Sequence, residues 1–255
     1  MLCLQTGMEK LMYNRVFTFG CSYTNWLWPT WANIIAYDLQ IPFYNLGQSG
    51  IGNIAISSII LEADLAYTFT KNDLIIVNWS SWHRIDIVDK SSREWAGGGN
   101  VFNNSMFPPK FVKKYWNQNN DIVKNATSII LSNRSVSIDY QSHMIDYEGR
   151  SEYGETSYNF TYYQNLLNAL PKKNVFNIKD NSHFNNTIED HHPDVLNHLA
   201  HACRIYETLN LTMQQSTVEK YHLLQDTIIN QINHSKINPN KDWDSLFKFF
   251  SEREL

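Results

Sequence analysis

Cysteine is scarce in this sequence of 255 residues, and the three that occur, Cys3, Cys21 and Cys203, lie far apart. They form no CxxC pair, which argues against a disulfide framework or a thiolate metal site and suits a reducing compartment. Basic clusters are missing as well: 21 Lys and Arg residues stand against 25 Asp and Glu residues, for a formal net charge of −4. This balance gives no electrostatic reason to expect nucleic acid or an anionic membrane as a partner.

Long apolar runs are also absent. No stretch approaches the roughly 20 residues that a membrane-spanning helix needs. Residues 1–14, MLCLQTGMEKLMYN, contain no apolar segment behind a basic end, as a signal peptide would. We therefore expect a soluble protein that is cytoplasmic where it is synthesised. The share of hydrophobic residues, 43%, is typical of a folded globular chain, and the length suits one or two domains.

Predicted strands alternate with predicted helices along the chain. Short apolar runs bounded by turn residues predict strands at 15–19, 43–46, 73–79 and 174–178. Apolar residues at helical spacing predict helices at 29–40 (with Pro29 in its first turn), 53–69, 111–133, 155–170, 194–208, 215–233 and 242–253.

This alternation predicts a three-layer α/β/α, flavodoxin-like domain with a mostly parallel sheet over residues 15–209. An N-terminal tail (1–14) precedes it, and a helical C-terminal extension (210–255) follows it. Residues 90–110 contain a glycine run and a proline pair, so we expect an irregular loop there. Since ligands bind beyond the carboxyl ends of parallel strands, the turns after the first three strands should meet at one edge.

Two of these turns carry candidate chemistry. In Gly20-Cys21-Ser22-Tyr23-Thr24, the Ser22 hydroxyl is expected at the mouth of a strand that enters a helix, where it could act as a nucleophile if a histidine removes its proton. The alternative is a plain serine helix cap. The second turn, residues 45–53, contains Gly47, Gly50 and Gly52, and its bare N–H groups could hold an oxyanion or only permit a left-handed turn.

A late polar stretch, residues 189–198, offers an imidazole with carboxylates just upstream. A carboxylate that accepts the Nδ1 proton would orient such a histidine as a general base. One alternative is a metal site built from His183, His191, His192 and His198, although the HExxH pair is absent. The other is a solvated acidic cap before a helix that has Pro193 at its first position.

Taken in order, these segments resemble the SGNH (GDSL-like) hydrolases over about residues 15–208. The Ser22 turn is similar to block I, Asn45-Leu46-Gly47-Gln48-Ser49-Gly50 to block II, and His192-Pro193 with Asn197-His198 to block V. The resemblance implies that Ser22 is the nucleophile, that His192 is the base, and that the Gly50 N–H helps to hold the oxyanion, with no metal or cofactor. The CSYT and WPTWA segments and the Trp79–Arg84 spacing resemble the phage-associated branch of the superfamily.

The sequence departs from the family pattern at two places. Block III, normally Gly-x-Asn-Asp, is here Ser80, Ser81, Trp82 and His83, so the usual asparagine donor to the oxyanion is missing. The candidates to replace it are Asn53, Asn78, Ser80 and Arg84; the alternative for Arg84 is an ion pair with Asp86 or another acid.

The second departure concerns the acid that orients the histidine. The family position, three residues before His192, holds Glu189, while Asp190 lies two before it. We favour Asp190 because a short side chain loses less rotamer entropy when it reaches a near neighbour. Cys21 is the other candidate nucleophile, with semi-buried packing as its alternative role.

The sequence thus predicts a serine esterase that acts through an acyl-enzyme on a small-molecule ester or on O-acyl groups of a glycan. The aromatic residues Trp26, Trp28, Trp31, Trp79 and Trp82 suggest the glycan because they could stack on sugar rings, although core packing explains most tryptophans. The alternatives are an acyltransferase of the same fold and a non-catalytic carbohydrate-binding module. The sequence leaves homo-oligomerisation open.

Overall fold

Five parallel strands form the main sheet in the computed structural model, which describes residues 13–81, 84–100, 117–144, 175–176 and 192–234. They are β1 (Arg15–Gly20), β2 (Phe43–Asn45), β3 (Asp73–Trp79), β6 (Tyr140–Met144) and β7 (Val175–Phe176). Their order across the sheet is β2-β1-β3-β6-β7, and each neighbouring pair is parallel. This is the 2-1-3-4-5 order of flavodoxin-like folds, so the predicted fold class is confirmed.

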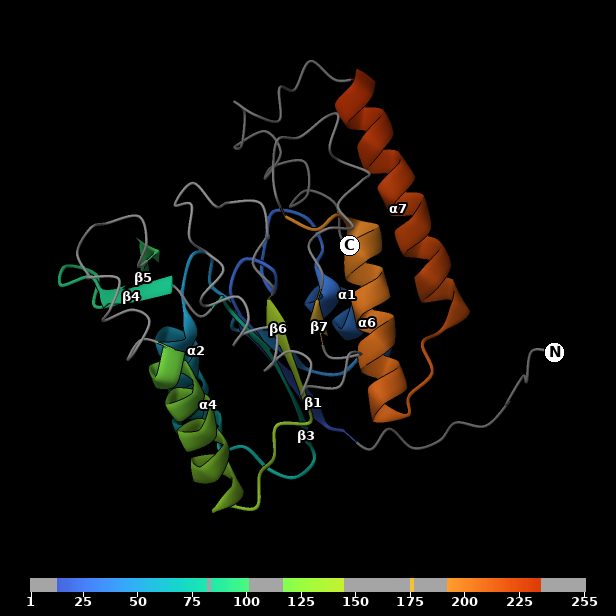
Figure 1. Cartoon of the computed structure of the whole chain (residues 1–255). Coiled ribbons are helices and arrows are strands. Elements are labelled where there is room, and N and C mark those ends of the chain that lie inside the picture. The colour runs from blue at the N-terminus through green and yellow to red at the C-terminus, as the bar shows by residue number, and fades with distance from the viewer. Residues whose placement is uncertain (1–12, 82–83, 101–116, 145–174, 177–191, 235–255) are drawn as a thin grey trace.

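Helices cover both faces of the sheet (Figure 1). One layer contains α1 (Trp31–Leu39), α6 (Val195–Leu209) and α7 (Gln215–His234), and the other contains α2 (Asn53–Tyr67) and α4 (Asn117–Ser132). Right-handed crossovers explain this division. The chain moves from β1 outward to β2 through α1, then reverses over β1 to β3 through α2, so the two helices fall on opposite faces.

The strands bury both faces because their apolar residues are continuous rather than alternating with polar ones. Val16, Leu74 and Ile76 pack in the core under α1, α6 and α7. Their neighbours along the chain, such as Phe17 and Ile75, pack in the core under α2 and α4. All seven residues of β3 are buried, as its apolar run predicts.

The described strands differ from the prediction in two regions. β6 was not predicted, because its sequence YQSHM has no apolar run; its register with β3 and the burial of Tyr140 and Ser142 identify it as an interior strand. The prediction of an irregular loop at 90–110 is wrong for residues 95–100. There, β5 (Trp95–Asn100) pairs antiparallel with β4 (Arg84–Val88) in a hairpin, and the glycine run forms part of β5.

The first helix begins at Trp31, two residues later than predicted. Thr30 is the N-cap of α1, and its N–H donates to the Asn33 side chain at 3.0 Å, so Pro29 precedes the cap instead of occupying the first turn. α7 packs against α6 and α1.

Some predicted elements lie outside the described residues. They are the helices at 155–170 and 242–253, most of the 174–178 strand and nearly all of the N-terminal tail. Of the helices that the structure describes, none is long and apolar enough to cross a membrane.

Candidate active site

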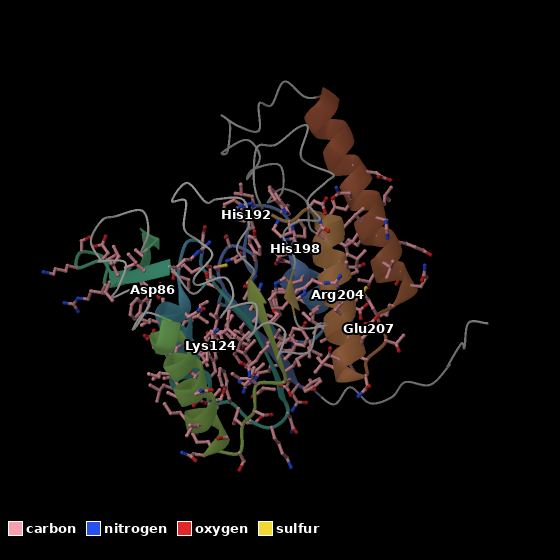
Figure 2. All side chains as sticks on the ribbon, in the orientation of Figure 1. Asp86, Lys124, His192, His198, Arg204 and Glu207 are labelled. Carbon is pink, nitrogen blue, oxygen red and sulfur yellow. The ribbon has the colours of Figure 1, made fainter. Side chains whose placement is uncertain are left out.

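The Ser22 hydroxyl and the His192 imidazole, 170 residues apart in sequence, meet at the carboxyl end of the sheet. His192 Nε2 lies 2.8 Å from Ser22 Oγ, a hydrogen-bond distance. Figure 2 shows His192 beyond the strand ends, near the start of α6. Ser22 is buried and His192 is half-buried, so the pair is largely withdrawn from water. The two residues that the motifs single out therefore have the geometry of a nucleophile and its general base.

Ser22 lies in a tight turn rather than at a helix end. The N–H groups of Thr24 and Asn25 donate to the Cys21 carbonyl at 2.9 and 3.3 Å. Because α1 begins only at Trp31, the prediction that the strand runs straight into a helix with its positive end beneath Ser22 is wrong. The helix-cap alternative for Ser22 fails for the same reason, since Thr30 occupies that position. Cys21 is completely buried in the α2-side core, more deeply than the semi-buried packing role predicts.

Three aromatic residues of the same segment hold His192 in place. The Trp26 indole stacks on the His192 ring, with centroids 3.7 Å apart and planes at 14°. Tyr23 approaches the ring edge-on at 5.4 Å, and Trp28 Nε1 donates to the Pro193 carbonyl at 2.8 Å. The imidazole is thus packed on the loop that carries Ser22.

The first turn of α6 fixes the chain direction just after His192. Asp194 is the N-cap, and its Oδ1 accepts from the Asn197 N–H at 2.8 Å. Pro193 therefore precedes the cap rather than opening the helix as the solvated-cap interpretation expects, and Asp194 is fully buried rather than solvated.

The Ser22 turn and the glycine turn after β2 are joined by hydrogen bonds. Gln48 N–H donates to the Gly20 carbonyl at 3.0 Å, and the Asn45 side chain donates to the Thr24 carbonyl at 3.0 Å. Gly47 is needed here for space, because a Cβ at this position would lie 2.8 Å from the Thr24 Cβ. The two turns therefore form one connected edge, as their place after neighbouring strands predicts.

The four candidates for the missing oxyanion donor differ in what they contact. Asn53 Nδ2 donates to the Ser80 carbonyl at 3.0 Å, and Arg84 Nη1 donates to the Ile51 carbonyl at 3.3 Å, so both hold backbone. The Asn78 amide and the Ser80 hydroxyl are buried and have no hydrogen-bond partner within the described structure. Because buried polar groups are normally paired, Asn78 and Ser80 retain donor capacity for a ligand or water.

The acids Glu189 and Asp190 lie outside the described residues, as do Trp82, His83, His183 and His191. Within the ranges that the structure does describe, no three His, Cys, Asp or Glu side chains are grouped so that they could hold a metal ion. Of the tryptophans proposed to stack on sugars, Trp31 and Trp79 are fully buried and pack in the two cores.

Two further imidazoles lie in the interior along α6, below His192 (His198 is labelled in Figure 2). Burial lowers the pKa of His198 well below its usual value, and the charges of His201 and His192 act in the same direction. Burial also lowers the pKa of His201 to about 3, with a smaller effect from Arg204. His201 Nε2 lies 3.4 Å from Ser142 Oγ. Both histidines are therefore neutral in the folded protein near pH 7.

Gly20, just before the Ser22 turn, gives the first testable prediction. A Cβ there would lie 2.7 Å from the Asn78 carbonyl oxygen and would overlap Thr24 Oγ1. Gly20→Ala must therefore move backbone, and we expect it to lower the free energy of unfolding by about 2–3 kcal/mol. Urea denaturation measures this, and a loss below about 0.5 kcal/mol would contradict the packing described here.

Comparison with known proteins gives a structural likeness but no match in sequence. No family model matches the sequence, and no curated protein matches it. The structure is similar to the crystal structure of a member of the lipolytic protein G-D-S-L family from Veillonella parvula DSM 2008. The identity is 12% and the TM-score 0.44, over 77% of this chain and 98% of that chain.

Some site residues were not predicted. The sequence marks Trp26 only as one of several aromatic residues, and nothing local indicates that it stacks on a histidine more than 160 residues away. Asp86 entered only as an ion-pair partner for Arg84, yet its carboxylate binds the start of α2. Both contacts join segments that are distant in sequence, so no spacing rule could have found them.

Proposed function

We propose that this protein is a serine esterase that cleaves a carboxylic ester through an acyl-enzyme on Ser22. The 2.8 Å distance between Ser22 Oγ and His192 Nε2 carries the proposal, because a serine hydroxyl becomes nucleophilic only when a base removes its proton. The order of the three sequence motifs supports the same assignment. The opening CSYT and WPTWA segments lead us to propose that the protein belongs to the phage-associated branch of the SGNH hydrolases. The scattered cysteines lead us to propose that it is synthesised in the cytoplasm.

The proposed reaction follows from these groups. Ser22 Oγ attacks the ester carbonyl while His192 Nε2 takes its proton, and the tetrahedral oxyanion accepts hydrogen bonds from the Ser22 and Gly50 N–H groups. His192 then returns the proton to the leaving alcohol, and water attacks the acyl-enzyme by the same route. Asp190, or Glu189, orients His192 through Nδ1. The buried amide of Asn78 and hydroxyl of Ser80 are the proposed replacements for the missing block III donor.

Trp26 has a testable part in this reaction. Its ring lies flat on His192, and an indole face attracts the imidazolium that forms in the transition state, by about 0.5–2 kcal/mol. Trp26→Leu should therefore lower kcat for p-nitrophenyl acetate about 3- to 30-fold, while Trp26→Phe retains more activity. A kcat equal to that of wild type in the Leu variant would contradict this role.

We propose an O-acylated glycan as the substrate class. Trp26 is half-buried beside His192, so part of its surface is available to a sugar ring at the reacting centre. Acetate release from an acetylated polysaccharide, compared with release by the Ser22→Ala variant, tests this choice. Equal release by both proteins would contradict it.

A fluorophosphonate probe separates the proposed esterase from its alternatives. Such a probe forms a bond to an activated serine, so wild type should be labelled and Ser22→Ala should not. An unlabelled but folded wild type would favour the non-catalytic binding module. If wild type is labelled and releases acetate only when an acceptor alcohol is added, the acyltransferase of the same fold is favoured instead.

A further inference from the structure

The β4–β5 hairpin lies against the glycine turn that contains Gly50, at the α2 side of the sheet (Figure 1). Gly97 of β5 packs directly on Gly50: a Cβ on Gly97 would lie 2.5 Å from the Gly50 carbonyl oxygen and 2.9 Å from its carbon. The Gln48 side chain donates to the Trp95 carbonyl, and Arg84 donates to the Ile51 carbonyl. The hairpin therefore contacts this turn at several successive residues.

Asp86 makes the most specific of these contacts. Its Oδ1 accepts from the Gly52 N–H, and its Oδ2 accepts from the N–H groups of Ile54 and Ala55 at 3.0 and 3.1 Å. These amides form the N-terminus of α2, whose N-cap residue, Gly52, has no side chain with which to satisfy them. Asp86, labelled in Figure 2, thus caps α2 from a different segment of the chain.

Gly52 cannot be replaced by a residue with its own capping side chain, because the space is taken. A Cβ on Gly52 would lie 2.9 Å from Asp86 Oδ2 and 3.0 Å from the Arg84 Cβ. Burial raises the pKa of the Asp86 carboxyl, and the three amide hydrogen bonds lower it. Burying a carboxylate costs free energy unless its oxygen atoms accept hydrogen bonds. The half-buried Asp86 carboxylate therefore depends on these three amides.

The turn is consequently fixed from both flanks. On one side, Gln48 N–H binds the Gly20 carbonyl of β1, next to the Ser22 turn. On the other side, Asp86 holds Gly52 and the start of α2. Gly50 lies between these anchors with φ +82°, a left-handed conformation, and Gly97 packs on it.

We propose that the β4–β5 hairpin fixes the oxyanion-binding turn, with Asp86 as its positioning residue and Gly97 as its contact point. This inference rests on the proposed function, which assigns the Gly50 N–H to the oxyanion. Oxyanion donors accelerate a reaction only when they are held in place before charge develops. Asp86 and Gly97 contact the Gly50 turn and the start of α2, and we argue that they act through that turn, so their effect should fall on kcat rather than on KM.

Two variants test the proposal, each with a control in the same hairpin. Asp86→Asn keeps the side-chain volume but turns an amide donor toward a backbone N–H, and Gly97→Ala forces the hairpin off Gly50. The control Asp89→Asn changes a carboxylate that binds only the hairpin's own turn. The control Val88→Ala shortens a side chain of β4 that is 52% exposed and so points away from the Gly50 turn.

For p-nitrophenyl acetate we expect Asp86→Asn and Gly97→Ala to lower kcat about 10- to 100-fold, since a displacement near 1 Å can cost about 100-fold. KM should change little, and both controls should stay within about twofold of wild type. Hydrogen exchange should show faster exchange at Gly52, Ile54 and Ala55 in Asp86→Asn. If one variant does not fold, the other carries the test.

The outcomes separate this inference from the proposed function. If wild type is active, Ser22→Ala is inactive, and both hairpin variants keep the wild-type kcat, the hairpin inference is overturned while the esterase stands. If wild type and Ser22→Ala show the same rate, the proposed function is overturned, and the hairpin inference with it. A loss of activity equal in the controls and in the two test variants would likewise overturn a role specific to Asp86 and Gly97.

Discussion

Replacing Ser22 with Ala, or His192 with Ala, is expected to lower kcat for ester hydrolysis by about 10⁴-fold or more. In the proposed reaction, the first change removes the oxygen that attacks the carbonyl. The second removes the imidazole that lies 2.8 Å from that oxygen and that we propose as its base, so the hydroxyl should stay protonated and weakly nucleophilic. Because the two groups act as one unit, the double variant should lose no more than either single variant does.

Steady-state hydrolysis of p-nitrophenyl acetate measures these losses. Ser132→Ala and His222→Ala are matched controls, since both residues are exposed and lie on α4 and α7, away from the strand ends. They should keep the wild-type rate. Comparable rates in wild type, Ser22→Ala and His192→Ala would show that the hydrolysis has another origin.

Acid should destabilise the fold strongly through His198 and His201. Their folded-state pKa values are lowered, His201 to about 3, so both stay neutral in the folded protein while the unfolded chain binds their protons below about pH 6.5. The unfolded state therefore holds more protons, and stability falls as the pH falls. For His201 the loss is about 1 kcal/mol per pH unit below pH 6.5, and His198 acts in the same direction.

Urea unfolding at several pH values between 5 and 8 tests this linkage. His201→Phe should unfold with a pH slope smaller by about one proton, because the phenylalanine cannot titrate. Its ring should fit between Trp31 and Tyr140, whose rings flank His201 at 5.7 and 6.0 Å. His222→Ala is the control for removing a histidine that is exposed instead of buried. An unchanged slope in His201→Phe would contradict the buried neutral state.

The parts of the fold that could be predicted are the segments whose own composition indicates whether they are buried or exposed. β1 and β3 are apolar runs that can only be buried, and their order with the intervening helices fixes a parallel sheet. β6 could not be predicted in this way. Its Ser142 is buried because His201 of α6 lies opposite, a contact that spans 59 residues of sequence. The hairpin was missed because glycines read as a loop, whereas here Gly97 allows two backbones to touch.

In the candidate site, too, some features could be predicted from local sequence and others could not. Motif order and strand ends were enough to predict that Ser22 and His192 face one another, and the 2.8 Å contact agrees with that expectation. The local conformation at Ser22 was predicted wrongly, because the helical pattern begins some residues later than the turn and Thr30 caps it. The contacts of Trp26 and Asp86 depend on which distant segments meet, and no local pattern encodes that.

The role of Ser22 is tested most directly by finding which atom of the protein carries the acyl group during turnover. Wild type is mixed with p-nitrophenyl acetate, quenched in acid within the burst, digested, and the peptide that contains Cys21 and Ser22 is fragmented in a mass spectrometer. The proposed mechanism predicts an acetyl ester on Ser22, which survives neutral hydroxylamine better than a thioester would. A thioester on Cys21, or hydrolysis without any acylated residue, would contradict it.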